Sequence, residues 1–190
     1  MSSADLSPAT IVLIIMAVLA IGVAVWMYLQ KKKTQDLRSK FGPEYDRAID
    51  AHKDRTHAES ELEKREKRVA QFHIRSLKED ERARYAEDWR VEQSLFVDNP
   101  RVAVKHADAL VQDVMKRRGY PVSDFEQNAA DLSVDHPRVV EHYRIAHEIA
   151  VRDGKGQSST EDLRRAMVSY RSLFDDLLEQ HAVRPEEVRK

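Results

Sequence analysis

Residues 160–181 read TEDLRRAMVSYRSLFDDLLEQH, and this stretch decides the fold class. Side chains expected in a core recur at steps of three and four residues, which is the spacing of one face of an α-helix. The positions are Leu163, Met167, Tyr170, Phe174, Leu177, Leu178 and His181. Two more stripes have the same period: Val104, Ala107, Val111, Val114 and Met115, and a shorter one of Tyr85, Trp89 and Phe96. The sequence therefore predicts an all-α fold with a compact helical bundle.

Glycine and proline separate these stretches into segments of helical length. Asn99-Pro100 and His136-Pro137 each predict a helix with proline in its first position, where the missing amide donor costs nothing. Gly119 and Gly154 predict helix ends. Three capping sequences predict further helix starts: Ser76 to Glu79, Ser123 to Glu126, and Thr160 with Glu161 and Asp162. Residues 95–104 can alternatively form a β-hairpin, but we favour helices because the second arm continues into a helical stripe.

An uncharged run from Ile11 to Leu29, IVLIIMAVLAIGVAVWMYL, contains no proline. As a helix it would be about 28 Å long, close to the hydrocarbon thickness of a bilayer. Trp26 and Tyr28 lie at its end, where aromatic rings favour the headgroup level. A cleaved signal peptide would instead need basic residues before the run and a small-residue cleavage site, and the sequence has neither. We predict an uncleaved transmembrane helix over residues 11–30.

The charges on either side of this run predict an orientation. Lys31, Lys32 and Lys33 follow it after Gln30, whereas Asp5 is the only charged side chain before it. Basic residues stay on the cytoplasmic side of a membrane helix. We therefore expect a single-pass protein of the cell (inner) membrane, with its N-terminus outside and its C-terminal domain in the cytoplasm.

Residues 44–71 differ from the rest of the chain because large apolar side chains are sparse among many charges. Opposite charges at i, i+4, such as Glu61 with Arg65, support a helix in water. We expect a solvated helix here, either a stalk or one strand of a weak coiled coil. The predicted organisation is a short tail (1–10), the transmembrane helix (11–30), a charged juxtamembrane helix or stalk (31–75), the helical bundle (76–182) and a second tail (183–190).

Composition and motifs exclude several classes of function. The chain has no cysteine, which excludes disulfide scaffolds and cysteine-based zinc sites. A net charge of -1 argues against a nucleic-acid-binding domain, which normally carries a basic excess. The positions of the five glycines allow neither a P-loop nor a dinucleotide-binding fingerprint. We expect no catalytic residues, no cofactor and no metal.

The densest polar feature is an acidic patch in the second half of the chain. It comprises Asp124, Glu126, Asp131 and Asp135, followed by His136. These acids can form a recognition surface or a cation site of oxygen ligands. Acids near helix starts also act as caps, and this second interpretation explains Asp124, Glu126 and Asp135 without a ligand. His142 and His147 have a spacing that does not place two metal ligands on one helical face.

Seven short motifs are distributed over the chain after residue 40, and each occurs once: FGPEYDR (41–47), RGYPV (118–122), DFEQ (124–127), AADLSVDHP (129–137), YRIAH (143–147), TEDLR (160–164) and YRSLF (170–174). Together they resemble a family of bacterial single-pass membrane proteins that has no assigned activity. The resemblance covers most of the chain after the apolar run. It implies a bacterial origin, and it brings no ligand, partner or catalytic residue with it.

These observations favour a membrane-tethered helical interaction or scaffold module that is not an enzyme. Its expected partners are the membrane, spanned once, and a protein, but not nucleic acid. A homo-oligomer through the transmembrane or juxtamembrane helix is an open alternative, since Ala20 and Ala24 form a small-xxx-small pair. The other function considered is a membrane-bound enzyme or sensor that binds a small molecule or cation in the bundle, using Asp131, Asp135 and His136.

Overall fold

The computed structural model describes the backbone of residues 8–179 and the side chains of residues 16–179. Over this range the chain forms eight α-helices and no strand, so the predicted all-α class is confirmed. The helices are α1 (Pro8–Phe41), α2 (Pro43–His52), α3 (Arg55–Val69), α4 (Glu79–Asp98), α5 (Pro100–Arg118), α6 (Phe125–Asp135), α7 (Val140–Gly154) and α8 (Thr160–Leu178). Residues 1–7 and 180–190, which include the predicted C-terminal tail and the last residues of the predicted bundle, lie outside the described range.

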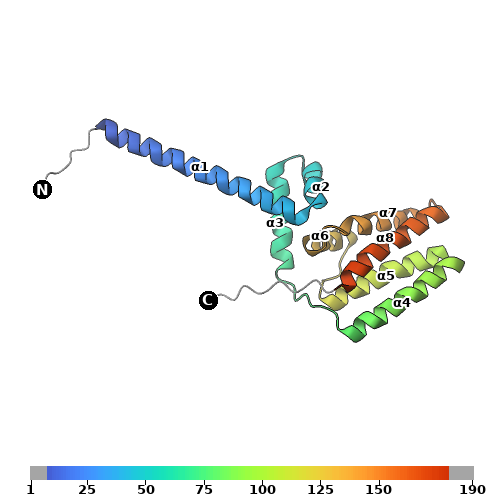
Figure 1. The fold of residues 1–190 in the computed structure, drawn as a ribbon. Helices are drawn as coiled ribbons and strands as arrows, with labels where there is room; N and C mark the ends of the chain where they lie inside the picture. Colours follow the sequence, from blue (N-terminus) through green and yellow to red (C-terminus); the bar gives the residue numbers. More distant parts are fainter. Residues whose placement is uncertain (1–7, 180–190) are drawn as a thin grey trace.

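A bundle of α4, α5, α7 and α8 contains the main core (Figure 1). The apolar stripes predicted from the sequence line it, and every described member of the two longer stripes is buried except Leu178, which is half-buried. Trp89 of α4 stacks on Phe174 of α8 with ring centroids 4.6 Å apart. Asn99 alone separates α4 from α5, so the alternative of a β-hairpin over residues 95–104 is wrong.

Helix ends follow the expected chemistry, with shifts of a few residues. Pro100 begins α5, and Gly119 ends it in the left-handed conformation with φ 100°. A side chain at Gly119 would also collide with the backbone of His73, since a Cβ there would lie 2.4 Å from its carbonyl oxygen. Two corrections concern proline and glycine: α7 begins at Val140 rather than Pro137, and it includes Gly154. The other three concern caps. Lys78 rather than Ser76 holds the N-cap position of α4, where its amide donates to Glu81. Asp124 caps α6 in place of Ser123, and Ser159 caps α8 in place of Thr160.

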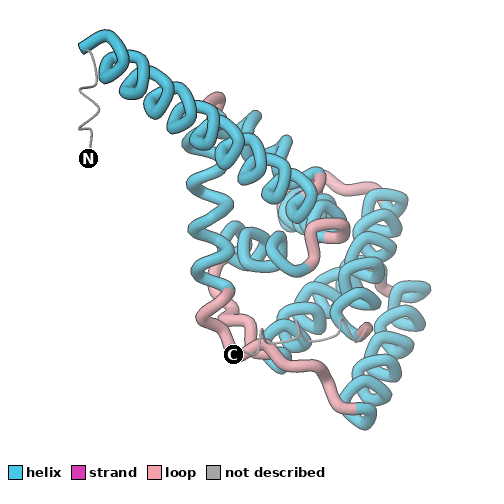
Figure 2. The backbone as a smooth tube through the Cα atoms, turned by 60° about the vertical axis from the view of Figure 1, so that its left-hand side comes forward, coloured by secondary structure: helices cyan, strands magenta, loops and turns pink. Residues whose placement is uncertain are grey.

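A second, smaller core lies between the end of α1, α2 and α3. It comprises Leu37, Phe41, Tyr45, Ala48, Ala58, Leu62 and Val69, together with Val134 of α6. The prediction of one solvated helix over residues 44–71 is therefore wrong. The chain reverses at Lys53 and Asp54, and α3 then packs against α2 and α6. Figure 2 shows α2 and α3 beside the C-terminal end of α1, between the long helix and the bundle.

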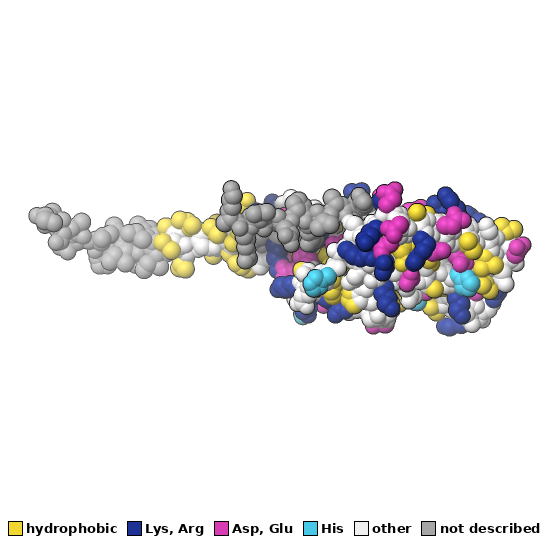
Figure 3. Space-filling model, turned by 90° about the horizontal axis from the view of Figure 1, so that it is seen from below, with side chains coloured by type: hydrophobic (Ala, Val, Ile, Leu, Met, Phe, Trp, Pro, Cys, Tyr) yellow, Lys and Arg dark blue, Asp and Glu magenta, His cyan; other side chains and the backbone are white. Residues whose placement is uncertain are grey.

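The long helix α1 joins two very different environments. Side chains from residue 16 to residue 33 are all exposed, including Trp26 at 62 %. Leu37 and Phe41, at the end of the same helix, are buried in the second core. The space-filling view shows the described apolar side chains of α1 as a rod that projects from a head covered with charged residues (Figure 3).

Among the residues that the structure describes, no helix is both long enough and apolar enough to cross a membrane. Residues 11–15, which begin the predicted transmembrane run, belong to α1, but their side chains lie outside the described set.

Candidate functional site

The predicted acidic patch lies on α6 and at its two ends. This helix lies between the two cores, because Ala129 and Leu132 belong to the main core while Val134 belongs to the second. Polar residues on α6 are therefore placed where the α1–α3 side of the molecule meets the bundle. The structure puts the five predicted residues into three separate settings.

Asp124 and Glu126 have the structural roles expected of acids at a helix start. The Asp124 carboxylate caps α6 by accepting a hydrogen bond from the Gln127 amide at 3.0 Å. The Glu126 carboxylate is exposed and lies 3.4 Å from the guanidinium of Arg144 on α7. Neither carboxylate faces an enclosed space.

Asp131 is the most buried member of the patch, with no exposed side-chain surface. Its carboxylate accepts hydrogen bonds from Arg68 Nε at 3.0 and 3.4 Å, and from Gln127 Nε2 at 2.8 Å. A buried carboxylate is costly unless it is paired and hydrogen-bonded, and Arg68 of α3 meets this need. Asp131 therefore holds α3 against α6, a role that its sequence position does not reveal.

Asp135 and His136 face the bundle instead. The Tyr120 hydroxyl donates to Asp135 at 3.0 Å, and burial together with this carboxylate raises the pKa of Tyr120 well above its usual value. His136 is buried, and its Nδ1 atom lies within hydrogen-bond distance of the Asp176 carboxylate on α8. His136 is the C-cap of α6, and its amide donates to the Leu132 carbonyl; the helix ends here because the residue before a proline, in this case Pro137, is disfavoured in the α conformation.

Arg118 completes the polar setting around His136. Its Nη1 atom lies 3.4 Å from His136 Nε2 and donates to the Leu177 carbonyl at 3.0 Å. The guanidinium therefore satisfies a carbonyl in the last turn of α8, where helices leave carbonyls without intrahelical partners. This arrangement ties α5, α6 and α8 together.

The five predicted residues do not converge on one ligand. Their partners come from different elements: α3 for Asp131, the segment after α5 for Asp135, and α8 for His136. Across residues 16–179, no group of three or more His, Asp or Glu side chains could hold a metal ion. Most of the patch is thus accounted for by helix capping and by contacts between helices.

Sequence reasoning missed an ion network that links α2, α3 and α7. The buried Glu44 carboxylate of α2 receives two hydrogen bonds from Arg144 of α7, from Nε at 3.2 Å and from Nη2 at 3.1 Å. Arg65 of α3 lies 3.6 Å from the same carboxylate and 3.4 Å from the Ser133 hydroxyl. Such a bidentate pair combines charge with fixed geometry. No local sequence signal predicts it, because Glu44 and Arg144 are far apart in the chain.

A second missed carboxylate, Glu59 of α3, joins the end of α1 to α2 and α3. It accepts hydrogen bonds from Thr34 at 2.8 Å, from Tyr45 at 2.9 Å and from Arg55 at 2.9 Å. Burial by itself would raise the pKa of Glu59, but these three hydrogen bonds outweigh it and lower the pKa below its usual value. Glu59 therefore stays ionised and fixes the exposed helix to the head.

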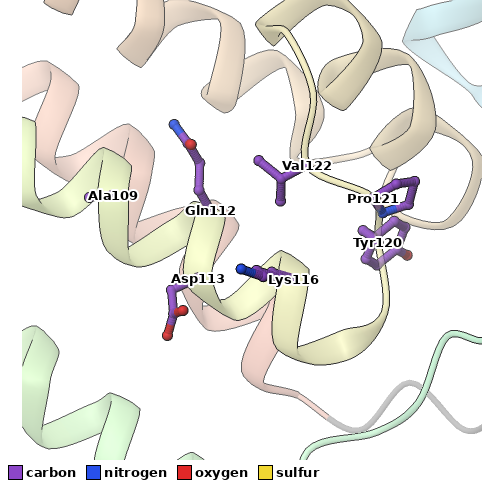
Figure 4. A pocket seen from close by; sticks show the side chains of 7 residues that line it. All are labelled: Ala109, Gln112, Asp113, Lys116, Tyr120, Pro121 and Val122. Carbon is purple, nitrogen blue, oxygen red and sulfur yellow. The ribbon is translucent and has the colours of Figure 1, made fainter.

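A shallow groove of about 500 Å³ runs along α5 and the segment that follows it. Its lining is Ala109, Gln112, Asp113, Lys116, Tyr120, Pro121 and Val122 (Figure 4). The Asp113 carboxylate in the lining accepts a hydrogen bond from Tyr85 at 2.7 Å. Two members of the predicted patch reach this lining through Tyr120: Asp135 accepts a hydrogen bond from its hydroxyl at 3.0 Å, and the centroid of the His136 ring lies 6.2 Å from that of the Tyr120 ring.

Comparisons of the chain with protein-family models, with curated proteins and with solved structures give no match. The inferences below therefore rest on residues and geometry. Two features are available for them: an exposed apolar helix fixed to a folded head, and a shallow groove along α5.

Proposed function

We propose that this protein is a membrane-tethered helical interaction module and not an enzyme. One observation carries the proposal: the same helix, α1, exposes its apolar residues from 16 to 29 and buries Leu37 and Phe41 in the head. Burying apolar surface is the largest favourable term available to such a rod. A lipid bilayer provides that burial for a helix with apolar side chains on all sides.

The proposed anchor is the full run from Ile11 to Leu29, which matches the thickness of a bilayer core at about 28 Å. The basic residues that follow it favour a head in the cytoplasm and an N-terminus outside, in the inner membrane of a bacterial cell. Because α1 continues into the second core without a break, the head would be held at a fixed distance from the bilayer rather than on a flexible tether.

The experiment that tests this proposal is reconstitution of the full chain with neutral phosphatidylcholine vesicles. The chain should float with the vesicles in a density gradient and resist extraction by alkaline carbonate. The matched variant Ile15→Asp/Val18→Asp/Ile21→Asp should stay in the soluble fraction, because a charge at the centre of a membrane helix costs about 3 kcal/mol. Flotation of neither protein would refute the anchor.

Orientation has its own test in cells. A cytoplasmic reporter fused after Lys190 should be active, and a phosphatase that works only outside the cytoplasm should be inactive at the same position. The opposite pair of results would reverse the proposed topology.

A protein partner would bind the head, and capture from membranes with mass spectrometry is the experiment that identifies it. Pairing of copies through α1 is the competing arrangement. Crosslinking of the reconstituted chain at low protein density separates the two, because a homo-oligomer gives a self-crosslink and a heterologous partner does not.

The groove along α5 favours a second candidate, a sensor of small molecules. It offers the Lys116 ammonium beside the apolar Pro121 and Val122. A thermal-shift screen of the detergent-solubilised chain against metabolites tests it. A stabilisation that disappears in Lys116→Ala would favour the sensor. So would its loss in Asp135→Ala, because that change removes the acceptor of the hydrogen bond from Tyr120 in the groove lining.

A further inference from the structure

The groove along α5 combines three kinds of side chain in one lining. Asp113 and Lys116 carry opposite charges, Gln112 is a neutral hydrogen-bonding group, and Pro121 and Val122 are apolar. Figure 4 shows Lys116 between Asp113 on one side and Val122 on the other. The volume of about 500 Å³ lies in the range of sites that hold small molecules. A ligand that fits this lining must satisfy both charges and an apolar wall.

The Asp113 carboxylate is positioned by a buried residue of α4. The Tyr85 hydroxyl donates to its Oδ2 atom at 2.7 Å. Burial together with this carboxylate raises the pKa of Tyr85 to about 12, so the phenol remains protonated and keeps donating at neutral pH. A carboxylate has about four acceptor sites, and one bond from Tyr85 therefore leaves capacity to accept from a ligand. Asp113 thus provides a negative charge in a fixed place.

Gln112 is positioned from the other side of the bundle. Its Nε2 atom donates to Asp108 Oδ2 at 2.7 Å, and the Tyr170 hydroxyl of α8 donates to Oδ1 of the same carboxylate at 2.9 Å. Because the amide nitrogen is used in this contact, the carbonyl oxygen of Gln112 is the group that can accept from a ligand. Two acceptors of the groove are therefore held in place through buried tyrosines of the core.

Lys116 provides the positive charge of the lining. It lies three residues after Asp113 on α5, so the two side chains leave neighbouring points of the helix surface, with about 5 to 6 Å between their Cβ atoms. The Tyr85 contact holds Asp113 toward α4, whereas Lys116 lies nearer to Val122 (Figure 4). One small molecule in the groove can therefore contact both charges.

We propose that this groove binds a small zwitterion, an amino acid with an apolar side chain. The inference rests on the second candidate function, the small-molecule sensor, and names the ligand class of its groove. The ammonium of the ligand donates to Asp113, and its carboxylate pairs with Lys116. Its side chain contacts Pro121 and Val122, and the Gln112 carbonyl can accept a further hydrogen bond.

The two charges together determine the selectivity of the groove. A simple anion is attracted by Lys116 but repelled by Asp113, and a simple cation meets the reverse combination. A molecule with both charges has a favourable partner for each, which is how opposed charges discriminate between ligands. Because Asp113 and Lys116 are exposed, each ion pair should change affinity by no more than about fivefold. Binding should therefore be weak, as suits an abundant metabolite.

The test is a saturation-transfer NMR titration of the full chain in detergent micelles, with empty micelles as the blank. The probes are L-leucine, 4-methylpentanoate, which lacks the ammonium, and 3-methylbutylamine, which lacks the carboxylate. Leucine should bind up to about fivefold more tightly than either analogue, since each analogue loses one exposed ion pair. Equal binding of the three probes would refute a zwitterion site.

Two variants should remove the preference for leucine in different ways. In Lys116→Gln, leucine should bind no more tightly than 3-methylbutylamine. In Asp113→Asn, it should bind no more tightly than 4-methylpentanoate. Asparagine still accepts from Tyr85, so the unfolding midpoint of Asp113→Asn should stay close to that of the natural chain. The matched control is Lys105→Gln, at an exposed position of α5 outside the lining, and it should keep the natural preference.

The outcomes separate this inference from the sensor on which it rests. If leucine binds equally to Lys116→Gln and to the control, its site lies elsewhere and the proposal is overturned. If leucine does not bind, but another metabolite stabilises the natural chain and not Lys116→Ala, the sensor stands and the amino-acid assignment is refuted. If no metabolite has this effect and leucine does not bind, both proposals fail.

Discussion

The two cores of this protein are stabilised in different ways. The bundle core is large and aromatic, and Trp89, Phe174, Tyr143 and Tyr170 are all buried in it. The core formed by α1, α2 and α3 is small, contains two alanines among its members, and is surrounded by the paired carboxylates Glu44, Glu59 and Asp131. The first core accounts for folding through apolar area, whereas the second needs specific polar contacts to fix its position.

The bundle core and the second core also have different roles in the molecule. The bundle has its own hydrophobic core, and each of its helices has one buried face and one exposed face. The second core contains the end of α1 and therefore sets how the exposed apolar helix leaves the head. Loss of packing should unfold the bundle, and loss of an ion pair should loosen α1, α2 and α3. The predictions that follow test this contrast, beginning with the largest expected effect.

Truncation of Trp89 should have the largest effect on stability. Trp89→Ala should lower the free energy of unfolding by about 3 to 5 kcal/mol, because the side chain is 1 % exposed and stacks on Phe174. Chemical denaturation of the detergent-solubilised chain measures the change. Val97→Ala on the same helix is the control, since Val97 is 82 % exposed and should change stability by less than about 0.5 kcal/mol. A similar loss in both variants would contradict the assigned core.

Removal of the Arg144 side chain should cause the second-largest loss of stability, and it should act on the second core. Arg144→Ala leaves the buried Glu44 carboxylate without its bidentate partner, at an expected cost of about 3 kcal/mol. The double variant Glu44→Gln/Arg144→Met should recover part of this loss, because no unpaired charge remains. Arg164→Ala serves as the control, as Arg164 forms an exposed pair with Glu161 and should be nearly neutral. If Arg144→Ala equals the control, the network does not hold α2 to α7.

Replacement of Glu59 should give a stability loss that depends on pH. Glu59→Gln should cost about 2 kcal/mol at pH 7, because the charged acceptor of three hydrogen bonds is lost. The lowered pKa means that the ionised form stabilises the fold above the usual value of 4.5, and this stabilisation is lost as the pH falls through the folded-state pKa. The difference between the natural chain and Glu59→Gln should therefore narrow below about pH 4.5. A constant difference down to pH 3 would contradict the ionised contact.

The smallest effect is expected at Asp124. Asp124→Ala should cost about 1 kcal/mol through loss of the α6 cap, and Asp124→Asn should restore most of it. Thermal unfolding followed by circular dichroism is sufficient to measure both. If Asp124→Ala instead weakened partner binding without lowering stability, Asp124 would belong to a recognition surface and not to a helix cap.

Sequence reasoning succeeded where a local pattern determines the structure. The stripe from Leu163 to Leu177 predicted the buried face of α8, since helical spacing and large apolar side chains coincide there. Pro100 and Gly119 predicted the two ends of α5, because both act through the backbone of their own residue.

The second core was missed for a physical reason. Beside Tyr45, Leu62 and Val69, the buried positions of α2 and α3 hold two alanines, which carry little hydrophobic signal, and two glutamates, which sequence patterns assign to solvent. The acids become buried only because of partners elsewhere, such as Arg144 for Glu44. For the same reason the patch from Asp124 to His136 could be located in the sequence but its role could not be assigned, because Arg68, Tyr120 and Asp176 contact it from other parts of the chain.

Hydrogen–deuterium exchange of the full chain in lipid nanodiscs tests most directly whether α2 and α3 are an integral part of the folded head. The packing of α1, α2 and α3 predicts slow exchange for amides within residues 45–52 and 58–69, close to that of α6. A solvated helix without tertiary packing is marginal in water, and its amides would exchange much faster. Fast exchange over these residues, with α4, α5, α7 and α8 still protected, would contradict the packing of α2 and α3 in the second core. It would instead favour the solvated stalk predicted from the sequence.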